Sequence, residues 1–579
     1  MENPYRTKNC GELTEKNIGE MVKIAGWTNS IRLLGGLCFI TIRDEFGVTQ
    51  VIIPNESMIK GINKECVISV EGKVIERISK NKNMATGDIE IEAKKIELLG
   101  DCKPVLPFEV MQSEQTKEDV RLKYRFLDLR NPLVHSKIKL RSNVLHFVRN
   151  KFHDLNFTEV QTPILTASSP EGARDFIVPS RLNSGKFYAL PQAPQQFKQL
   201  LMASGFNKYF QIAPCFRDED PRADRSPGEF YQIDLEMSFS TQEEVLQVVE
   251  NVVSSTFAQF SNKSISKSPF SRISYSQAME TYCSDKPDTR NPLTVCDVTD
   301  VFIATEFSIF KNKTIKAIVA PANNKPRKFF DDLTKVIVKY EGKGLAYVKV
   351  TEEGVIGSVV KNLSQQELKN LLSKTNAKIG ETIFIIAEEK TKAIKLAGVL
   401  RNTLGKELEL INNNLFNFVW VLDFPFFELD DENKLAFSHN PFSMPQGGLN
   451  SLEAKDPLSI VAYQYDLVLN GVELASGAVR NSNPMLMKKV FKMAGYEDDV
   501  VETKFSALYN AFQYGVPPHA GLALGFDRII MFLTDSEVIR DVIAFPLNGM
   551  AQDLLLNAPN TVTQKQLDDV NIQIKKVIK

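Results

Sequence analysis

The chain has 579 residues, which is too many for one hydrophobic core, so its length predicts two to four domains. Hydrophobic residues make up 43% of the chain, a composition typical of an ordinary soluble globular protein. The formal net charge of −1, taken over the whole chain, argues against nucleic-acid binding.

The cysteine and histidine content argues against a structural zinc site. The seven cysteines include no CxxC pair, and the chain has only five histidines. Free thiols indicate a reducing compartment. The N-terminal residues have no apolar signal core, and no stretch is long enough to span a bilayer. We therefore expect a cytoplasmic protein with no membrane association.

Residues 1–107 have the pattern of short strands. Apolar and polar residues alternate over about five segments, which Gly and Asn turn signals separate. These segments are 22–27, 39–43, 48–53, 67–72 and 89–92. Five short strands in this length predict a small barrel, with an OB-fold as the leading interpretation. A five-stranded barrel of unknown purpose is the alternative.

Residues 108–135 are predicted to form a linker, and residues 136–153 a helix with a buried stripe at Val144, Val148 and Phe152. From Lys117 to Lys151 the chain has ten Lys or Arg against three Asp or Glu, a local net charge of about +7. This run is either a solvated helix face or a patch that contacts phosphates. The sequence does not choose between the two.

Two arginine motifs lie far apart in the chain. The first, Phe216-Arg217-Asp218-Glu219, has predicted antiparallel strands at 210–213 and 231–237 on either side, and the second covers 521–528 and ends in Arg528. Each motif alone is typical of a solvated turn or a closely packed strand. The chain has no Gly-rich phosphate loop, because it lacks a GxxxxGK[ST] motif and a GxGxxG motif after a strand. Without such a loop, an extended triphosphate needs two arginines from distant parts of the chain, and the two motifs together supply them. Residues 284–410 are lysine-rich and are predicted to form a domain inserted between the two motifs.

Arginines at these positions fit a site that joins a carboxylate to ATP. The carboxylate and the α-phosphate repel each other, and an arginine offsets that repulsion in the transition state. Arg217 suits this role, and Arg528 would hold the far phosphates. Asp466 and Glu473 supply the carboxylates that Mg²⁺ prefers beside phosphate oxygens. Two acids seven residues apart are nevertheless more often surface residues.

A buried arginine selects an acidic ligand, because two parallel hydrogen bonds bind a carboxylate strongly. Arg480 follows a strand of small residues that would let a ligand approach, and Lys198 could share the carboxylate. As isolated residues, both are more typical of ordinary surface or salt-bridge positions.

The full set of motifs resembles the class II aminoacyl-tRNA synthetases, and in particular the bacterial aspartyl-tRNA synthetases. Pro163 falls where motif 1 belongs, and the two arginine motifs match motifs 2 and 3. The resemblance also rests on residues 168–176, 191–199, 284–288, 439–442, 518–521 and 540–546. It covers nearly the whole chain, including the insertion of the bacterial type. One departure, Ser226 in the motif 2 loop, puts an ATP contact at that position in doubt.

The resemblance implies a multidomain α/β and α+β protein. Its parts would be an N-terminal OB-fold β-barrel that binds the anticodon (1–107), a linker or hinge (108–135), and a class II antiparallel-sheet catalytic domain (136–283 and 411–579). Motifs 1 and 2 lie in the first part of the catalytic domain, and motif 3 and a C-terminal extension lie in the second. An α+β domain would be inserted at 284–410. Because motif 1 forms the family's dimer interface, a homodimer is expected.

The resemblance also implies a set of site residues. For aspartate these are Glu171, Gln195, Lys198, Arg217, Asp234, His439 and Arg480, with Arg480 and Lys198 at the side-chain carboxylate and Gln195 and Asp234 at the ammonium group. For ATP they are Arg217, Asp218, Glu219, Glu473, Gly525, Phe526, Asp527 and Arg528. Arg217 and Arg528 would be the catalytic arginines, and Asp466 and Glu473 would bind Mg²⁺. In the barrel, Phe39 would stack on an anticodon base and Gln50 would read its edge.

The implied reaction has two steps and needs no protein nucleophile. L-aspartate attacks the α-phosphate of ATP to give aspartyl-adenylate and pyrophosphate, and the 3′ end of tRNA-Asp then takes the aspartate. The sequence leaves open whether tRNA-Asn is also charged. The alternatives are a sister enzyme for asparagine or lysine, which the insertion and the Arg480 and Lys198 pair oppose, and an inactive tRNA-binding paralogue, which the intact arginine motifs oppose.

Overall fold

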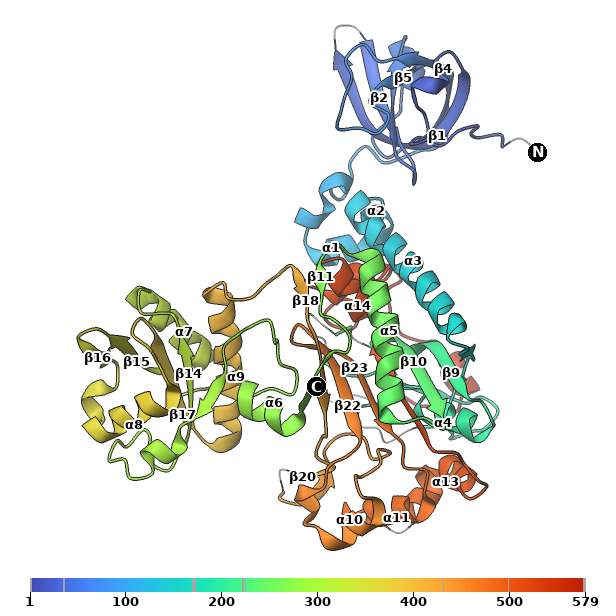
Figure 1. Cartoon of the computed structure of the whole chain (residues 1–579). Helices are drawn as coiled ribbons and strands as arrows, with labels where there is room; N and C mark the ends of the chain where they lie inside the picture. The colour runs from blue at the N-terminus through green and yellow to red at the C-terminus, as the bar shows by residue number, and fades with distance from the viewer. Residues whose placement is uncertain are drawn as a thin grey trace. The chain divides into compact units, whose positions relative to one another are not determined.

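The computed structural model describes residues 3–34, 37–168, 173–220, 223, 225–226, 228–430, 432–497 and 499–575. The chain divides into two compact units, Met1–Thr116 and Lys117–Lys579. Figure 1 shows the helices and strands of both units.

The first unit is a closed five-stranded barrel with the strand order β1-β2-β3-β5-β4, as the sequence predicts. The strands are β1 (Met21–Leu34), β2 (Leu37–Arg43), β3 (Val48–Ile53), β4 (Val67–Glu76) and β5 (Ile89–Gly100). Alternate residues point into the barrel, so that Ile40 and Ile42 of β2 and Val51 of β3 are fully buried. The intervening residues, Phe39 and Gln50 among them, are half-buried on the other face.

The first unit extends beyond the boundary at residue 107 that the sequence analysis placed. Residues up to Thr116 belong to it, including the 3₁₀ helix η3 (Val110–Gln115). Val110 is fully buried, and Arg43 of β2 donates a hydrogen bond to Met111 Sδ at 3.5 Å. Short apolar contacts of this kind have no periodicity, which is why the sequence pattern assigned this segment to a linker.

The second unit is built on an eight-stranded sheet with the order β12-β19-β22-β23-β24-β10-β9-β6. Its strands are β6 (Thr158–Glu159), β9 (Lys208–Arg217), β10 (Gly228–Ser238), β12 (Ser271–Ser274), β19 (Phe418–Leu422), β22 (Gln464–Leu469), β23 (Val472–Val479) and β24 (His519–Gly525). Pairing is antiparallel except at the two edges, β12 with β19 and β6 with β9. The predicted antiparallel pair around Arg217 is β9 with β10.

Helices cover one face of this sheet (Figure 1). They are α3 (Pro132–Asp154), α5 (Gln242–Phe260) and α14 (Phe526–Leu533), and their buried side chains share one core with the sheet. The core takes every second residue of β10, namely Ile233, Leu235 and Met237. The period of two therefore leaves Gln232, Asp234 and Glu236 on the opposite face, where the site described below lies.

The basic run at 117–151 is largely used within this unit. Arg121 and Arg125, on α1 (Glu118–Lys123) and α2 (Arg125–Asp128), both pair with Asp128. Arg125 also donates to the carbonyl oxygens of Ile543 at 2.8 Å and Ala544 at 2.9 Å. Much of this charge is therefore neither a free solvated face nor a free phosphate patch.

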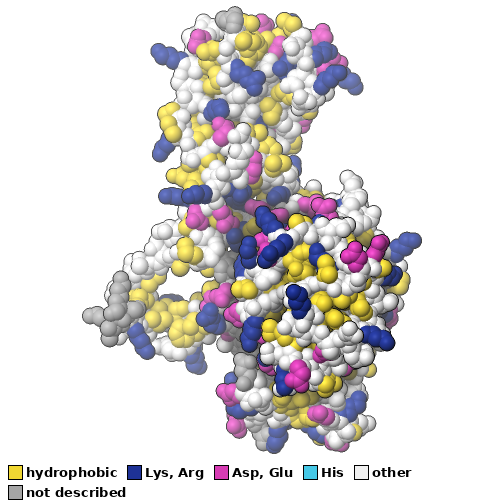
Figure 2. All heavy atoms as spheres, turned by 90° about the vertical axis from the view of Figure 1, so that its left-hand side faces the viewer, with side chains coloured by type: hydrophobic (Ala, Val, Ile, Leu, Met, Phe, Trp, Pro, Cys, Tyr) yellow, Lys and Arg dark blue, Asp and Glu magenta, His cyan; other side chains and the backbone are white. Residues whose placement is uncertain are grey.

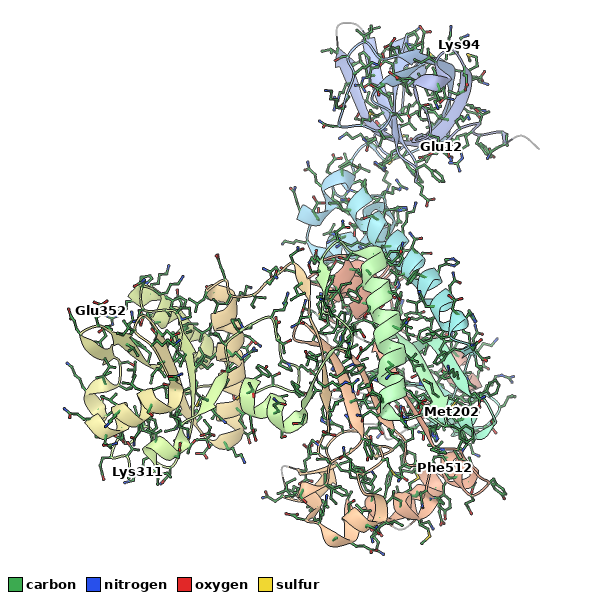
Figure 3. The ribbon with its side chains drawn as sticks, viewed as in Figure 1. Glu12, Lys94, Met202, Lys311, Glu352 and Phe512 are labelled. Carbon is green, nitrogen blue, oxygen red and sulfur yellow. The ribbon has the colours of Figure 1, made fainter. Side chains whose placement is uncertain are left out.

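The insertion forms its own layered domain. Its antiparallel sheet has the order β13-β14-β17-β15-β16, with α7 and α9 packed on one face and α8 on the other. The elements are β13 (Val295–Asp297), β14 (Thr314–Ala320), β15 (Ala346–Thr351), β16 (Gly354–Gly357), β17 (Thr382–Glu388), α7 (Arg327–Lys339), α8 (Gln365–Thr375) and α9 (Lys390–Glu407). Figure 3 labels Lys311 and Glu352 within it.

Shorter elements complete the second unit. They are α4 (Gln195–Ala203), α6 (Tyr275–Tyr282), α10 (Gly448–Ala454), α11 (Pro484–Met493), α12 (Val500–Lys504), α13 (Ser506–Phe512), α15 (Gln564–Asp569), β7 (Ile177–Pro179), β8 (Phe187–Ala189), β11 (Ser264–Ile265), β18 (Leu415–Phe416), β20 (Phe427–Leu429) and β21 (Leu435–Phe437). No helix in the described ranges is long and apolar enough to cross a membrane. Figure 2 shows cationic and acidic side chains interspersed over the face it presents.

Candidate active site

A cavity of about 750 Å³ opens on the polar face of the eight-stranded sheet. Its lining comes from β9, β10, β22, β23, β24 and α4, so residues from distant parts of the chain meet in it. Most of the residues that the sequence analysis assigned to aspartate, ATP and Mg²⁺ line this cavity. They are Gln195, Lys198, Arg217, Glu219, Asp234, His439, Asp466, Glu473, Arg480, Gly525, Asp527 and Arg528.

Three assigned residues are not in this lining. Asp218 pairs with Arg174 at 3.6 Å and keeps 52% of its side chain exposed. Phe526 is fully buried in the core beneath the sheet. Glu171 lies outside the described residues.

One end of the cavity holds a buried network of charges. Lys198 Nζ lies 2.7 Å from Asp234 Oδ1 and 3.3 Å from Glu236 Oε2. Arg480 donates to both oxygens of Glu236, through Nε at 2.8 Å and Nη2 at 3.2 Å. None of these four side chains is more than 2% exposed, so the network has two cations and two carboxylates that are almost fully shielded from solvent.

The buried network leaves polar atoms without partners. Among the described residues, Arg480 Nη1, Asp234 Oδ2 and Gln195 Nε2 are buried and have no hydrogen-bond partner. Such atoms are costly unless a ligand satisfies them. Arg480 and Gln195 offer donors for a carboxylate, and Asp234 offers an acceptor for an ammonium group. The Gln195 amide also carries an oxygen, which is the acceptor that an ammonium group would need.

The charged states of this network follow from burial and pairing. Burial raises the pKa of Asp234, and the Lys198 ammonium opposes that shift. Burial also acts on Glu236, but the charges of Arg480 and Lys198 outweigh it and lower the pKa of Glu236. Burial acts against the Arg480 charge as well, yet Glu236 raises the pKa of Arg480. Arg480 and Glu236 therefore stay charged against each other.

The other end of the cavity carries the two motif arginines. Arg217 ends β9, where its Nε donates to the Gln192 carbonyl oxygen at 3.3 Å and its guanidinium lies over the Phe230 ring at 5.0 Å. Arg528, in the first turn of α14, donates through Nη1 to the Glu473 carbonyl oxygen at 2.5 Å. Two guanidinium groups from different elements thus face one space that could take an anionic chain.

Asp466 and Glu473 lie on the neighbouring strands β22 and β23. Asp466 is 4% exposed, and its Oδ1 has no partner among the described residues. Burial and the nearby Glu473 carboxylate raise the pKa of Asp466 well above its usual range. Burial acts in the same direction on Glu473, but Lys286, Arg528 and Arg217 outweigh it and lower its pKa.

This acidic pair fits a magnesium ion that arrives with phosphates. Mg²⁺ is usually bound through one or two carboxylates plus phosphate oxygens. Asp466 and Glu473 supply two carboxylates, and the unpartnered Asp466 Oδ1 is available as a ligand. Over the described ranges no group of three or more His, Cys, Asp or Glu could hold a metal by itself, so phosphate oxygens would have to complete the shell.

Two further assigned carboxylates are engaged by arginines. Glu219 pairs with Arg225 across the motif 2 loop. Asp527 pairs with Arg141 of α3 and accepts a hydrogen bond from the Tyr231 backbone N–H at 2.9 Å. Because both Asp527 oxygens are engaged, this carboxylate fixes α14 against β10 and α3 rather than facing a ligand.

His439 lies at the edge of the cavity, packed against aromatic rings. Its ring centroid is 5.0 Å from that of Phe424 and 6.4 Å from that of Tyr275. Burial lowers the pKa of His439, so the ring is neutral at pH 7. Beside the cavity, α4, which carries Lys198, packs against α13; Figure 3 labels Met202 on α4 and Phe512 on α13.

Three residues of this site were not assigned from the sequence. Glu236 holds Arg480 and Lys198 together, Lys286 pairs with Glu473, and Arg141 holds Asp527. Only Glu236 had a usable signal, because a residue two positions after Asp234 on the same strand must share its face.

The two barrel residues assigned to the anticodon lie on adjacent strands. Phe39 of β2 is opposite Ile52, and Gln50 of β3 is opposite Thr41, so the two share the outer face. Gln50 donates to Glu90 Oε2 at 2.8 Å and accepts from Arg77 Nη2 at 3.0 Å. The amide of Gln50 is thereby held in a fixed orientation.

Two family models match the chain. Residues 117–549 match the class II tRNA synthetases (D, K and N), and residues 22–99 match the OB-fold nucleic acid binding domain. Among curated proteins, the chain is 50% identical to an aspartate–tRNA(Asp/Asn) ligase of Orientia tsutsugamushi, over 98% of each chain. It is 48% identical to an aspartate–tRNA ligase of Streptomyces coelicolor, over 99% of each chain.

Solved structures share the fold at low sequence identity. An asparaginyl-tRNA synthetase from Pyrococcus horikoshii, complexed with asparaginyl-adenylate, matches with a TM-score of 0.58 and 18% identity, over 93% of this chain and 97% of that chain. An aspartyl tRNA synthetase from Entamoeba histolytica matches with a TM-score of 0.55 and 18% identity, over 93% of this chain and 91% of that chain.

Proposed function

The chain belongs to the class II tRNA synthetases of the aspartate, lysine and asparagine family, and we propose that it is an aspartate–tRNA ligase. The observation that carries the choice of amino acid is the buried Arg480, whose Nη1 has no partner while Glu236 holds the rest of the guanidinium. A ligand carboxylate at Nη1 and near Lys198 would complete this network. An asparagine or lysine side chain would leave it incomplete.

In the first step the chain's residues bind and orient the two substrates. Asp234 takes the ammonium group of aspartate through Oδ2, while Arg480 and Lys198 take its side-chain carboxylate. Arg217, at the rigid end of β9, lies beside the α-phosphate and offsets its repulsion of the attacking carboxylate. Arg528 binds the far phosphates. Positioning and charge supply the acceleration, and no side chain acts as a nucleophile.

Magnesium would be held by Asp466 and Glu473, as their geometry allows. When bound, it neutralises phosphate charge as pyrophosphate leaves. Among the other residues assigned to ATP, Glu219 contacts the nucleoside end. Asp218, Gly525, Phe526 and Asp527 act by shaping the backbone around the two arginines.

The first unit is proposed to read the anticodon of tRNA-Asp. Phe39 offers a ring for base stacking, and Gln50, held by Glu90 and Arg77, offers an amide edge. Several similar proteins are named as ligases for both tRNA-Asp and tRNA-Asn, which favours the same dual range here. We also propose a homodimer formed through the segment around Pro163, and a cytoplasmic location.

Aspartylation of tRNA-Asp and tRNA-Asn transcripts, measured side by side, tests this function. Charging of both is the expected result. Charging of tRNA-Asp alone would retain the ligase and refute the dual range. Charging of neither, with modified native tRNA also failing, would refute the ligase itself.

A further inference from the structure

Lys286 lies in the segment that leads into the inserted domain, and its side chain enters the phosphate end of the cavity. Its Nζ is 3.0 Å from Glu473 Oε2 and 3.5 Å from Asp285 Oδ2. We call residues 285–293 the root of the inserted domain. Lys286, in this root, thus pairs with one of the two carboxylates proposed to hold magnesium.

This root is anchored firmly to the inserted domain. Arg401 of α9 is 1% exposed and donates to the carbonyl oxygens of Asp288 at 2.9 Å, Asn291 at 2.7 Å and Leu293 at 2.6 Å. Asn291 Nδ2 returns a hydrogen bond to the Arg401 carbonyl oxygen at 2.9 Å. These hydrogen bonds fix the backbone of residues 288–293 to α9.

The same root is anchored to the eight-stranded sheet. Asn417 Nδ2 donates to Thr289 Oγ1 at 2.9 Å. Gly471, at φ +87° in the turn between β22 and β23, comes so close that a Cβ there would lie 3.2 Å from Asp288 Cβ. Since β22 carries Asp466 and β23 carries Glu473, the distance from Lys286 to the acidic pair is set by rigid contacts on both sides.

An ammonium at Glu473 occupies a carboxylate oxygen that a divalent cation needs. We propose that Lys286 is a positioning residue of the ATP site, which holds Glu473 as a resident counter-ion that magnesium must displace. The root of the inserted domain thereby sets the magnesium concentration at which the site takes nucleotide. The inference rests on the proposed function, because it requires the cavity to bind Mg²⁺ with ATP.

Two roles for Lys286, competition with Mg²⁺ at Glu473 and simple binding of phosphate, predict opposite changes in the magnesium concentration needed for nucleotide binding. If Lys286 competes with Mg²⁺, its removal lowers the magnesium concentration needed for nucleotide binding. If Lys286 serves mainly to bind phosphate, its removal raises that concentration or weakens binding at saturating magnesium. Because the pair is partly exposed, with 39% of Lys286 and 30% of Glu473 accessible, the shift should be modest.

The test is calorimetric binding of α,β-methylene-ATP to the full-length protein over a series of Mg²⁺ concentrations, without turnover. We expect the magnesium midpoint to fall about two- to fivefold in Lys286→Met and Lys286→Gln, and to stay near the wild-type value in Lys286→Arg. Asp285→Asn is the matched neighbour: it frees the ammonium for Glu473 and should raise the midpoint. Magnesium binding to free nucleotide is identical for all variants, so any difference comes from the protein.

The outcomes separate the two proposals. Wild-type protein that binds no analogue at any magnesium concentration would refute the proposed function. Wild-type protein that binds the analogue, with an unchanged or raised midpoint in both Lys286→Met and Lys286→Gln, would refute the role of Lys286 alone. Thermal unfolding of each variant confirms that the folded protein is being compared.

Discussion

At the end of the cavity proposed to bind the amino acid, Lys198, Asp234, Glu236 and Arg480 are each at most 3% exposed, whereas Lys286 and Glu473, at the end proposed to bind phosphates, keep 39% and 30% of their side chains accessible. The buried end has balanced charges and a few unpartnered atoms among the described residues, which suits a small ligand of fixed shape. The open end holds its cations on different elements, which suits a longer and more mobile anion. The buried end is therefore the one we propose for ligand selection, and the open end is the one we propose for the chemistry.

Because the charges at the buried end are shielded from solvent, we expect changes there to affect both the free energy of unfolding and the choice of ligand. Arg480→Ala leaves the buried Glu236 carboxylate paired with Lys198 alone. We expect kcat/KM for aspartate in pyrophosphate exchange to fall about a thousandfold, and the free energy of unfolding to fall by about 3 to 5 kcal/mol.

Arg480→Lys is the matched control, because it keeps the charge but loses the two parallel hydrogen bonds. It should recover most of the stability in denaturant unfolding while aspartate activation stays poor. Near-normal kcat/KM in either variant would contradict the account of the buried end.

At the open end, activity and stability should separate. Arg217→Ala removes a half-buried guanidinium that would face the α-phosphate, so kcat for pyrophosphate exchange should fall about a hundredfold or more. The free energy of unfolding should fall by only about 1 kcal/mol, because the hydrogen bond to Gln192 and the contact with Phe230 are the interactions lost. Destabilisation as large as that of Arg480→Ala would remove the distinction between the two ends.

A substitution in the first unit serves as a control for the variants at both ends of the cavity, because it should leave amino-acid activation unchanged. Phe39→Leu removes the ring proposed to stack on an anticodon base, so KM for tRNA should rise about tenfold. Aspartate-dependent pyrophosphate exchange, which needs no tRNA, should stay at the wild-type rate. A loss of exchange in this variant would argue against the separate role assigned to the barrel.

The smallest predicted effect is a pH dependence behind the buried end. His519 is fully buried beside this network, and burial lowers its pKa, although Glu236 opposes the shift. Below the unfolded-state pKa of about 6.5, the unfolded chain binds a proton that the folded chain does not, so stability falls as pH drops toward the folded pKa. His519→Gln should reduce this slope by up to about 1.4 kcal/mol per pH unit. Equal slopes in denaturant unfolding at pH 5 to 7 would contradict this.

The sequence was most informative where a motif or a hydrophobic period predicts a strand, a helix or a site directly. Alternation gave the barrel strands, the stripe at Val144, Val148 and Phe152 gave α3, and the two arginine motifs gave the ends of β9 and β24. These signals are local, so one chain suffices to read them.

The residues that the sequence did not assign act through partners far away in the chain. Arg141 pairs with Asp527, which lies 386 positions later in the chain. From the sequence alone, Arg141 could not be distinguished from the solvated cations of the basic run. Lys286 reaches Glu473 only because Arg401 and Gly471 fix the root between two domains. Long-range pairs of this kind have no sequence period, so the fold had to be known first.

We propose that the buried Arg480, which Glu236 holds in place, selects an acidic amino acid. Pyrophosphate exchange with the wild-type protein, run separately with aspartate, asparagine and lysine, tests it most directly. We predict exchange with aspartate, and a kcat/KM at least about a thousandfold lower with asparagine or lysine. Comparable exchange with asparagine or lysine would contradict the claim.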